Sequence, residues 1–102
     1  MRRAAKGDAN KTAIVDALRR AGCSVSDTPV GNGFPDIAVG IPVGAQGRTV
    51  LLELKDGGKV PSARHLTEAQ EKWHAEWRGE AYVIDSLDEA LALVGEIRRG
   101  LR

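Results

Sequence analysis

Residues 48–55 constrain the fold of this chain more than any other segment. Their sequence is RTVLLELK, in which the apolar side chains do not alternate with polar ones. Such a run is typical of a strand that is covered on both faces, as in the interior of an α/β sheet. Two charged residues, Glu53 and Lys55, interrupt the end of this strand, where burying an unpaired charge is costly. The segment therefore predicts an internal strand with a charged end.

Helical spacing of apolar residues predicts three helices, at about residues 8–22, 67–79 and from 86 onward. The first carries an apolar stripe of Ile14, Ala17, Leu18 and Ala21. Trp73 and Trp77 lie four residues apart in the second helix, so they are expected to share its buried face. Two of the helices begin with the pattern of a capping box, Thr67 to Gln70 and Ser86 to Glu89.

Strands are expected at residues 23–27, 36–41, 48–55 and 81–84. The short connection at 44–47 predicts antiparallel pairing of the second and third strands. The last strand follows a helical crossover, which predicts parallel pairing. The chain is thus predicted to form one α/β domain over residues 1–102, with a mixed four-stranded sheet flanked by helices on both sides, in the order αβββαβα. Short basic tails are expected at its ends, containing Arg2, Arg3, Lys6, Arg98, Arg99 and Arg102.

Composition excludes several classes of protein. The formal net charge is only +1, so total charge points to no particular partner. A single cysteine, Cys23, cannot form a disulfide within the chain and is expected to be a small buried residue. No apolar run is long enough to span a membrane, and no signal-peptide pattern is present. A soluble cytoplasmic protein with no membrane partner is expected.

Asp36, Glu53 and Lys55 form the constellation that carries chemistry. Asp36 opens one strand, directly after Pro35, and Glu53 and Lys55 close the next strand with both side chains on one face. Adjacent strands lie about 4.8 Å apart, so the two carboxylates can converge on one hard cation such as Mg²⁺. A cation there supports phosphodiester hydrolysis. Lys55 would orient the attacking water or stabilise charge on the phosphate.

A purely structural interpretation exists for each of these residues. Glu53 and Lys55 could form a surface salt bridge, which contributes roughly 0–1 kcal/mol, and Asp36 could cap a turn. Together, however, three charged residues interrupt strands that are expected to be buried. The cost of burying such charges favours a functional site.

These residues resemble the signature of the PD-(D/E)XK nucleases, Pro35-Asp36 followed by Glu53-Leu54-Lys55. The VRR-NUC branch of small viral and bacterial nucleases is more similar still, because it shares the pattern of residues 33–36 and a following helix that begins like Thr67 to Gln70. The resemblance implies a restriction-endonuclease-like fold.

The resemblance also implies roles for individual residues. Asp36, Glu53 and the backbone carbonyl of Leu54 would bind the metal, and Lys55 would be catalytic. Gln70 would lie with them in the active site, although it is equally well explained as the capping partner of Thr67. Lys59, Arg64 and His65, in the loop beside the site, would contact DNA phosphates or would simply be solvated.

The implied function is a Mg²⁺- or Mn²⁺-dependent DNA endonuclease that acts on branched DNA, such as Holliday junctions or flaps, in replication or recombination. A homodimer is expected. One departure stands out, because the family usually carries an acid in its first helix and Ala13 occupies the expected position. Asn10 is a possible substitute. The alternative function is an inactive nucleic-acid-binding or structural protein that retains the fold.

Overall fold

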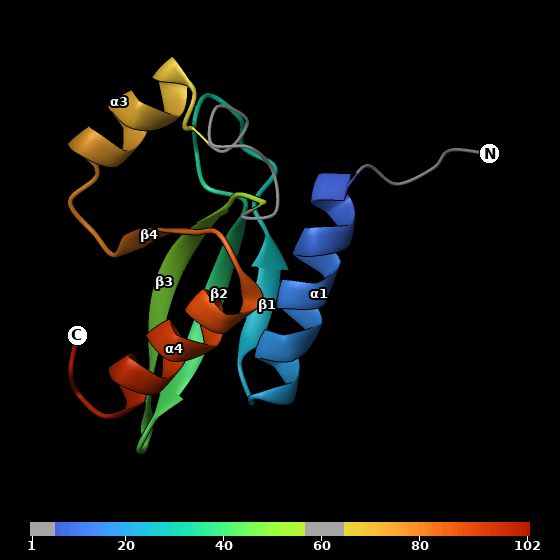
Figure 1. Cartoon of the computed structure of the whole chain (residues 1–102). Coiled ribbons are helices and arrows are strands. Elements are labelled where there is room, and N and C mark those ends of the chain that lie inside the picture. The colour runs from blue at the N-terminus through green and yellow to red at the C-terminus, as the bar shows by residue number, and fades with distance from the viewer. Residues whose placement is uncertain (1–5, 57–64) are drawn as a thin grey trace.

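The computed structural model describes residues 6–56 and 65–102 of the chain. Its elements follow the predicted order αβββαβα (Figure 1): α1 (Lys6–Arg20), β1 (Ser24–Asp27), β2 (Ile37–Val43), β3 (Gln46–Leu54), α3 (Glu68–Glu76), β4 (Ala81–Ile84) and α4 (Leu87–Arg98). Lys59 and Arg64, two of the predicted DNA contacts, lie outside the described residues.

The four strands form one sheet in the order β1-β2-β3-β4. β1 and β2, like β2 and β3, pair antiparallel, whereas β3 and β4 pair parallel, and both predicted pairing directions are confirmed. β2 and β3 are joined by a two-residue turn between the paired residues Val43 and Gln46. Gly44, at φ 58°, supplies the positive φ that the first central residue of such a tight turn requires.

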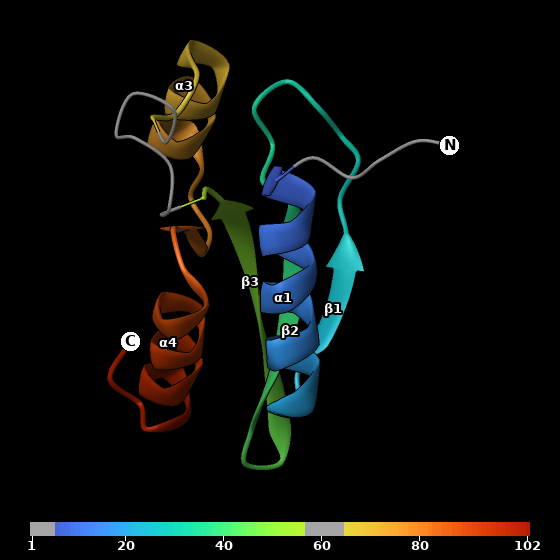
Figure 2. The ribbon, with the colours of Figure 1, turned by 45° about the vertical axis from the view of Figure 1, so that its right-hand side comes forward.

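The hydrophobic core lies between the sheet and two helices that cover the same face, α1 and α4 (Figures 1 and 2). Alternate strand residues point into it, and the helices contribute one stripe each. Its buried residues are Ile14, Leu18, Cys23, Ile37, Val39, Ile41, Val50, Leu52, Ile84, Ala90, Leu93, Val94 and Ile97. The predicted burial of Cys23 is confirmed, and its thiol is free.

α3 lies past the end of the strands (Figures 1 and 2), where its Gln70 side chain contacts Glu53 on the face opposite the core. In the described residues, helices therefore cover one face of the sheet along its length, and α3 adjoins only the end of the other face. The strand residues on this second face are mostly small and neutral: Ser24, Ser26, Ala38, Gly40, Thr49, Leu51, Ala81 and Val83. The expectation that β3 is buried on both faces holds only near Glu53, because Thr49 is exposed and Leu51 is half-buried.

The prediction that Trp73 and Trp77 lie on a buried face is wrong. No residue of α3 is buried, and 43% of the Trp77 surface is exposed. The two rings instead stack on each other and meet the edge of Phe34. α3 stays close to the loop before β2 because Gly33 has no side chain: a Cβ there would lie 2.3 Å from the Ala69 carbonyl oxygen.

The helix ends follow the predicted local chemistry. Thr67 and Gln70 form a complete capping box at the start of α3. At α4, the Ser86 hydroxyl accepts from the Glu89 N–H, but the Glu89 carboxylate accepts from Asp85 rather than from Ser86. α3 ends at Glu76, three residues before the predicted Gly79. In the described part of the chain, no helix is both long and apolar enough to cross a membrane.

Candidate active site

The pairing of β2 with β3 brings Asp36 and Glu53 together. Ile37 pairs with Leu52, and the Asp36 N–H donates to the Leu52 carbonyl at 3.0 Å. Continuing this antiparallel register by one residue places Asp36 opposite Glu53, with both side chains on the same face. The predicted convergence of the two carboxylates therefore follows directly from strand register.

Asp36 is held rigidly by its neighbours. Its Oδ2 accepts a hydrogen bond from the Leu54 N–H at 2.7 Å. Its backbone carbonyl accepts from the Thr28 N–H at 3.1 Å, and the Thr28 hydroxyl donates to the carbonyl of the buried Pro35. These bonds fix the loop that enters β2, so the Asp36 carboxylate has a preset position at the end of the two central strands. If Asp36 only capped a turn, one of these hydrogen bonds would be enough.

Glu53 is a buried carboxyl group, with 2% of its surface exposed. Its Oε2 accepts a hydrogen bond from Gln70 Nε2 at 3.1 Å, and Lys55 Nζ lies 4.0 Å from the same oxygen. Its Oε1 is buried and has no hydrogen-bond partner among the described residues. Burial raises the pKa of Glu53 to about 8, and the adjacent Asp36 adds to the rise, whereas Lys55 opposes it.

Gln70 closes the capping box and also contacts Lys55 and Glu53. Its Oε1 accepts from the Thr67 N–H at 2.9 Å, closing the capping box, and from Lys55 Nζ at 2.8 Å. Because both partners are donors, they require the amide oxygen, and the amide nitrogen is left to face Glu53. The helix cap thus orients the Gln70 side chain so that it contacts both Glu53 and Lys55.

The first helix reaches the site through Asn10. Its Nδ2 donates to the Lys55 carbonyl at 3.1 Å. Ala13 is exposed, so the expectation that it occupies the inward position is wrong. The buried stripe of α1 centres on Ile14 and Leu18, which turns Ala13 away from the sheet. Among the described side chains of α1, Asn10 contacts the backbone of Lys55 in the candidate site.

The two carboxylates fit a hard divalent cation such as Mg²⁺ or Mn²⁺. Such ions prefer oxygen ligands. The buried Glu53 Oε1, next to Asp36, is an oxygen that accepts no hydrogen bond from the described residues. A cation would satisfy it and remove the repulsion between the two acids. The site is sparse, however: across residues 6–56 and 65–102, no group of three or more His, Cys, Asp or Glu side chains is placed to hold a metal.

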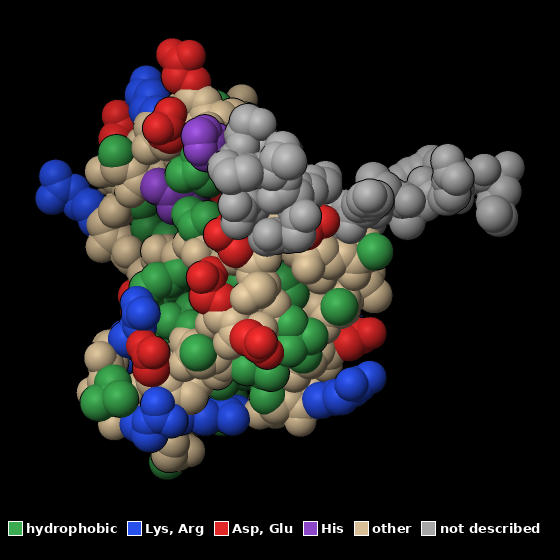
Figure 3. Space-filling model, in the orientation of Figure 1, with side chains coloured by type: hydrophobic (Ala, Val, Ile, Leu, Met, Phe, Trp, Pro, Cys, Tyr) green, Lys and Arg blue, Asp and Glu red, His purple; other side chains and the backbone are tan. Residues whose placement is uncertain are grey.

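The two histidines, one just before α3 and one within it, differ in their exposure to solvent. Both gather in the same region of the surface, shown in purple in Figure 3. His65 is exposed, as a phosphate contact would have to be. His74 is half-buried, and burial, followed by the positive charge of Lys55, lowers its pKa. Sequence spacing alone gave no sign that His74 lies near Lys55.

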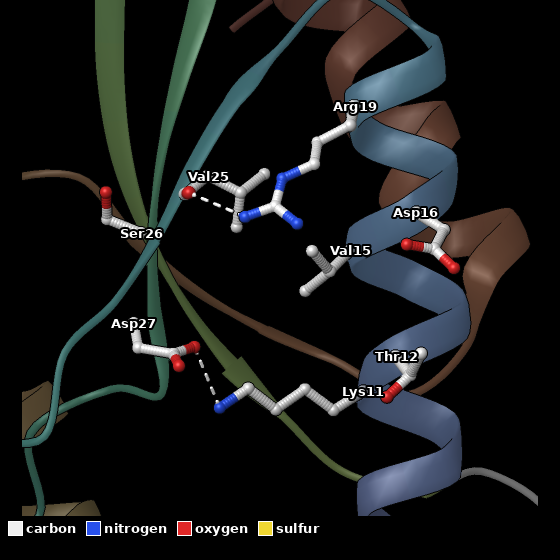
Figure 4. Close-up of a pocket in the computed structure, with 8 residues that line it drawn as sticks. All are labelled: Lys11, Thr12, Val15, Asp16, Arg19, Val25, Ser26 and Asp27. Atoms are coloured by element: carbon white, nitrogen blue, oxygen red, sulfur yellow. Dashed lines mark hydrogen bonds and ion pairs between the residues drawn. The ribbon is translucent and has the colours of Figure 1, made fainter.

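A separate cavity of about 380 Å³ lies between α1 and the edge strand β1 (Figure 4). Lys11 Nζ bridges it to Asp27 at 3.0 Å, and Arg19 donates to the Val25 carbonyl at 3.2 Å. These contacts tie α1 to β1 and occupy its basic side chains. The cavity includes none of the predicted site residues.

Comparison with known proteins supports the fold. No protein-family model matches the chain, and no curated protein is similar enough to count as a match. A solved structure described as a VRR_NUC domain superposes with a TM-score of 0.63 at 19% sequence identity, over 90% of this chain and 97% of that chain. At this identity the match shows the fold: the predicted α/β architecture, a mixed four-stranded sheet in the order αβββαβα, is confirmed, and it is similar to that of a VRR_NUC domain.

Proposed function

We propose that the chain is a metal-dependent endonuclease that hydrolyses DNA phosphodiester bonds. The observation that carries this proposal is the buried Glu53 carboxyl group, set opposite Asp36 and contacted by Lys55 and Gln70. Burying a carboxylate with an unpartnered oxygen is costly. A cation bound there would offset this cost, and the similarity to a VRR_NUC domain supports the same function.

The residues divide the chemistry between them. Asp36, Glu53 and the Leu54 carbonyl would hold Mg²⁺ or Mn²⁺, which supplies Lewis-acid activation of the phosphoryl group and of water. Lys55 places a positive charge beside Glu53, where it can stabilise negative charge that develops on the phosphate. Gln70 positions Lys55 through the 2.8 Å hydrogen bond to its ammonium group.

The substrate is proposed to be branched DNA, such as a Holliday junction or a flap, which implies a role in replication or recombination. His65 is exposed beside the site, and Lys59 and Arg64 are the further phosphate contacts that the sequence offers. The proposal includes a homodimer, because a domain of this size offers a small DNA footprint and a two-fold junction suits a two-fold protein.

A cleavage assay on matched linear, flap and four-way DNA, with Mg²⁺ or Mn²⁺, tests this function. We expect cleavage that is abolished by chelation and by Glu53→Ala, with preference for a branched substrate. Glu89→Ala is the matched control, because it removes a carboxylate from α4 that caps a helix outside the site. Equal cleavage by parent and Glu53→Ala protein would contradict the proposal.

The alternative is a nucleic-acid-binding protein that lacks catalysis. The specific observation in its favour is the sparse ligand set, in which Asn10 approaches the site where the family usually has an acid. Metal-independent DNA binding with no cleavage of any substrate would establish this alternative and would exclude the endonuclease.

A further inference from the structure

A surface pocket adjoins the candidate active site. It has a volume of about 260 Å³ and lies between the loop before β2 and one side of α3. Asn32 forms the loop wall, and the helix wall is formed by Ala69, Lys72, Trp73 and Glu76. These four residues have the spacing i, i+3, i+4, i+7, so they form a continuous strip along the helix.

One aromatic side chain, Trp73, lines this pocket, and neighbouring rings hold it in place. The Trp73 and Trp77 rings stack with centroids 4.7 Å apart and planes at 20°. Phe34 meets Trp73 edge-on at 5.1 Å and Trp77 at 6.1 Å, which fixes both indoles. Since no α3 residue is buried, this cluster is not part of the core, and its partial exposure leaves ring surface available to a ligand.

The rest of the lining is polar and chemically varied. Asn32 offers an amide donor and acceptor, Glu76 a carboxylate acceptor, and Lys72 an ammonium group. Asn32 adopts a left-handed backbone conformation with φ 54°, which asparagine tolerates better than most residues. A flat apolar wall, hydrogen-bonding groups of both kinds and one cation match a nucleotide, which has a flat base, a mixed donor–acceptor edge and a phosphate.

The pocket and the candidate site are built on the same two segments, α3 and the loop before β2. Ala69 lines the pocket, and the next residue, Gln70, contacts Glu53 and Lys55. On the loop side, Asn32 lies four residues before Asp36, and Gly33 packs against the Ala69 carbonyl. A DNA strand whose phosphate lies at the carboxylates can therefore place a neighbouring nucleotide at α3.

We propose that this pocket binds an unpaired nucleobase of the DNA strand next to the phosphate that is cleaved. The inference rests on the proposed function and adds a selectivity device to it. The base packs against Trp73, its edge meets Asn32 and Glu76, and Lys72 contacts the backbone. A paired base inside a duplex is not available to such a pocket, whereas an unpaired base at a flap or branch enters it at little cost.

The chain carries its own reporter for this contact. Its two tryptophans, Trp73 and Trp77, both belong to the aromatic cluster, so intrinsic tryptophan emission comes only from this region. Lys55→Ala protein, which should not cut the probe, is titrated with a short single-stranded oligonucleotide in Mg²⁺. The titration is then repeated with a series of oligonucleotides of the same sequence, each with one abasic site at a different position. We expect quenching by the intact strand, and at one abasic position a loss of quenching with roughly 5- to 150-fold weaker binding.

Substitutions of the polar residues that line the pocket test whether the change in DNA binding arises there. Asn32→Gly keeps the left-handed backbone available while removing the amide, and Glu76→Gln removes the carboxylate. Both should weaken binding of the intact strand and leave binding of the sensitive abasic strand unchanged. Glu71→Gln is the matched control, because Glu71 is an exposed acid of α3 that does not line the pocket; it should bind both strands like the parent.

The outcomes separate this inference from the proposed function. If the chain cleaves DNA but every abasic strand binds and quenches like the intact one, the base pocket is wrong and the endonuclease stands. If tryptophan emission changes with protein concentration in the absence of DNA, the cluster contacts a second copy of the chain and the base pocket is also wrong. If the chain neither binds nor cleaves DNA, both proposals fall.

Discussion

At the scale of single residues, the site depends on a few polar contacts around one buried acid. Glu53 is held by Gln70, approached by Lys55 and set opposite Asp36. Asp36 is preset by the Leu54 N–H. Each of these groups has a separable job, so removing one at a time should produce different defects.

Lys55→Ala is expected to reduce single-turnover cleavage by about 10²–10³-fold, because it removes a preorganised charge that acts on the transition state. Divalent-metal and DNA binding should largely survive, since Asp36 and Glu53 supply the side-chain ligands. Glu53→Ala should instead lose metal binding and cleavage together. Metal titration, DNA binding and cleavage are compared for the three proteins. Parental cleavage by Lys55→Ala would reduce Lys55 to a salt-bridge partner.

The raised pKa of Glu53 predicts how the metal-free protein responds to pH. Between the ordinary pKa of 4.5 and the folded value of about 8, the folded state binds more protons than the unfolded state. The contribution of Glu53 to stability should therefore be greatest below this range and fall as pH rises through it. Metal affinity should rise over the same range, because binding displaces the proton.

Denaturant unfolding of metal-free protein at several pH values measures this slope. Glu53→Gln should flatten it, because the amide does not titrate, whereas Asp88→Gln, a change at the exposed start of α4, should leave it unchanged. A parental slope in Glu53→Gln would show that another group is responsible.

At the scale of elements, two helices bring side chains to the end of the central strands that the strands alone would not supply. α1 delivers Asn10, and α3 delivers Gln70 through its capping box. Neither contact is local in sequence: Asn10 meets a residue 45 positions away, and Gln70 meets one 17 positions away. The orientation of each helix therefore matters to the chemistry.

Asn10→Asp should tighten Mn²⁺ binding by roughly tenfold, since each factor of ten corresponds to about 1.4 kcal/mol and the change adds a carboxylate oxygen beside the existing acids. The metal-free variant should be less stable than the parent, because three acids then repel one another. Calorimetry measures the affinity. Ala13→Glu is the control: its carboxylate should be exposed and leave affinity unchanged. Unchanged affinity in Asn10→Asp would place Asn10 outside the metal site.

The two N-caps offer a matched pair of substitutions. Thr67→Ala and Ser86→Ala each remove a hydroxyl that accepts from the third residue of a helix, and each should cost about 1 kcal/mol of stability. Only Thr67→Ala should also slow cleavage, because the cap it breaks orients Gln70. Equal effects on cleavage would mean that Gln70 is positioned without its cap.

At the scale of the whole molecule, the fold is asymmetric. α1 and α4 cover one face of the sheet, while α3 covers only the end of the other. The candidate site lies at this end, between β2, β3 and α3. Such a placement lets a long substrate pass the site without displacing the core.

The chain is expected to form a homodimer. Light scattering at micromolar concentration should give twice the 10.9 kDa chain mass, with or without DNA, and a four-way junction should bind one dimer. A mutant blocked in DNA binding serves as control, because it separates self-association from assembly on DNA. Monomers under all these conditions would refute the two-fold model.

The sequence by itself determined the order of elements and the meeting of the charged residues. Apolar periodicity distinguishes helix from strand, and strand register places Asp36 opposite Glu53 without any knowledge of the helices. The Thr67–Gln70 pattern also determined a cap, because a capping box needs only four consecutive residues.

Only the tertiary structure decided which helix side chains reach the site. A helix turns by about 100° per residue, so the rotation of α1 about its axis decides which of its side chains faces the site. In the structure that side chain is Asn10, and Ala13 is exposed. The tryptophans of α3 have the spacing of a buried stripe, but whether a stripe is buried depends on a partner surface. α3 packs against the loop before β2 instead of a core, and its Gln70 side chain contacts the buried Glu53.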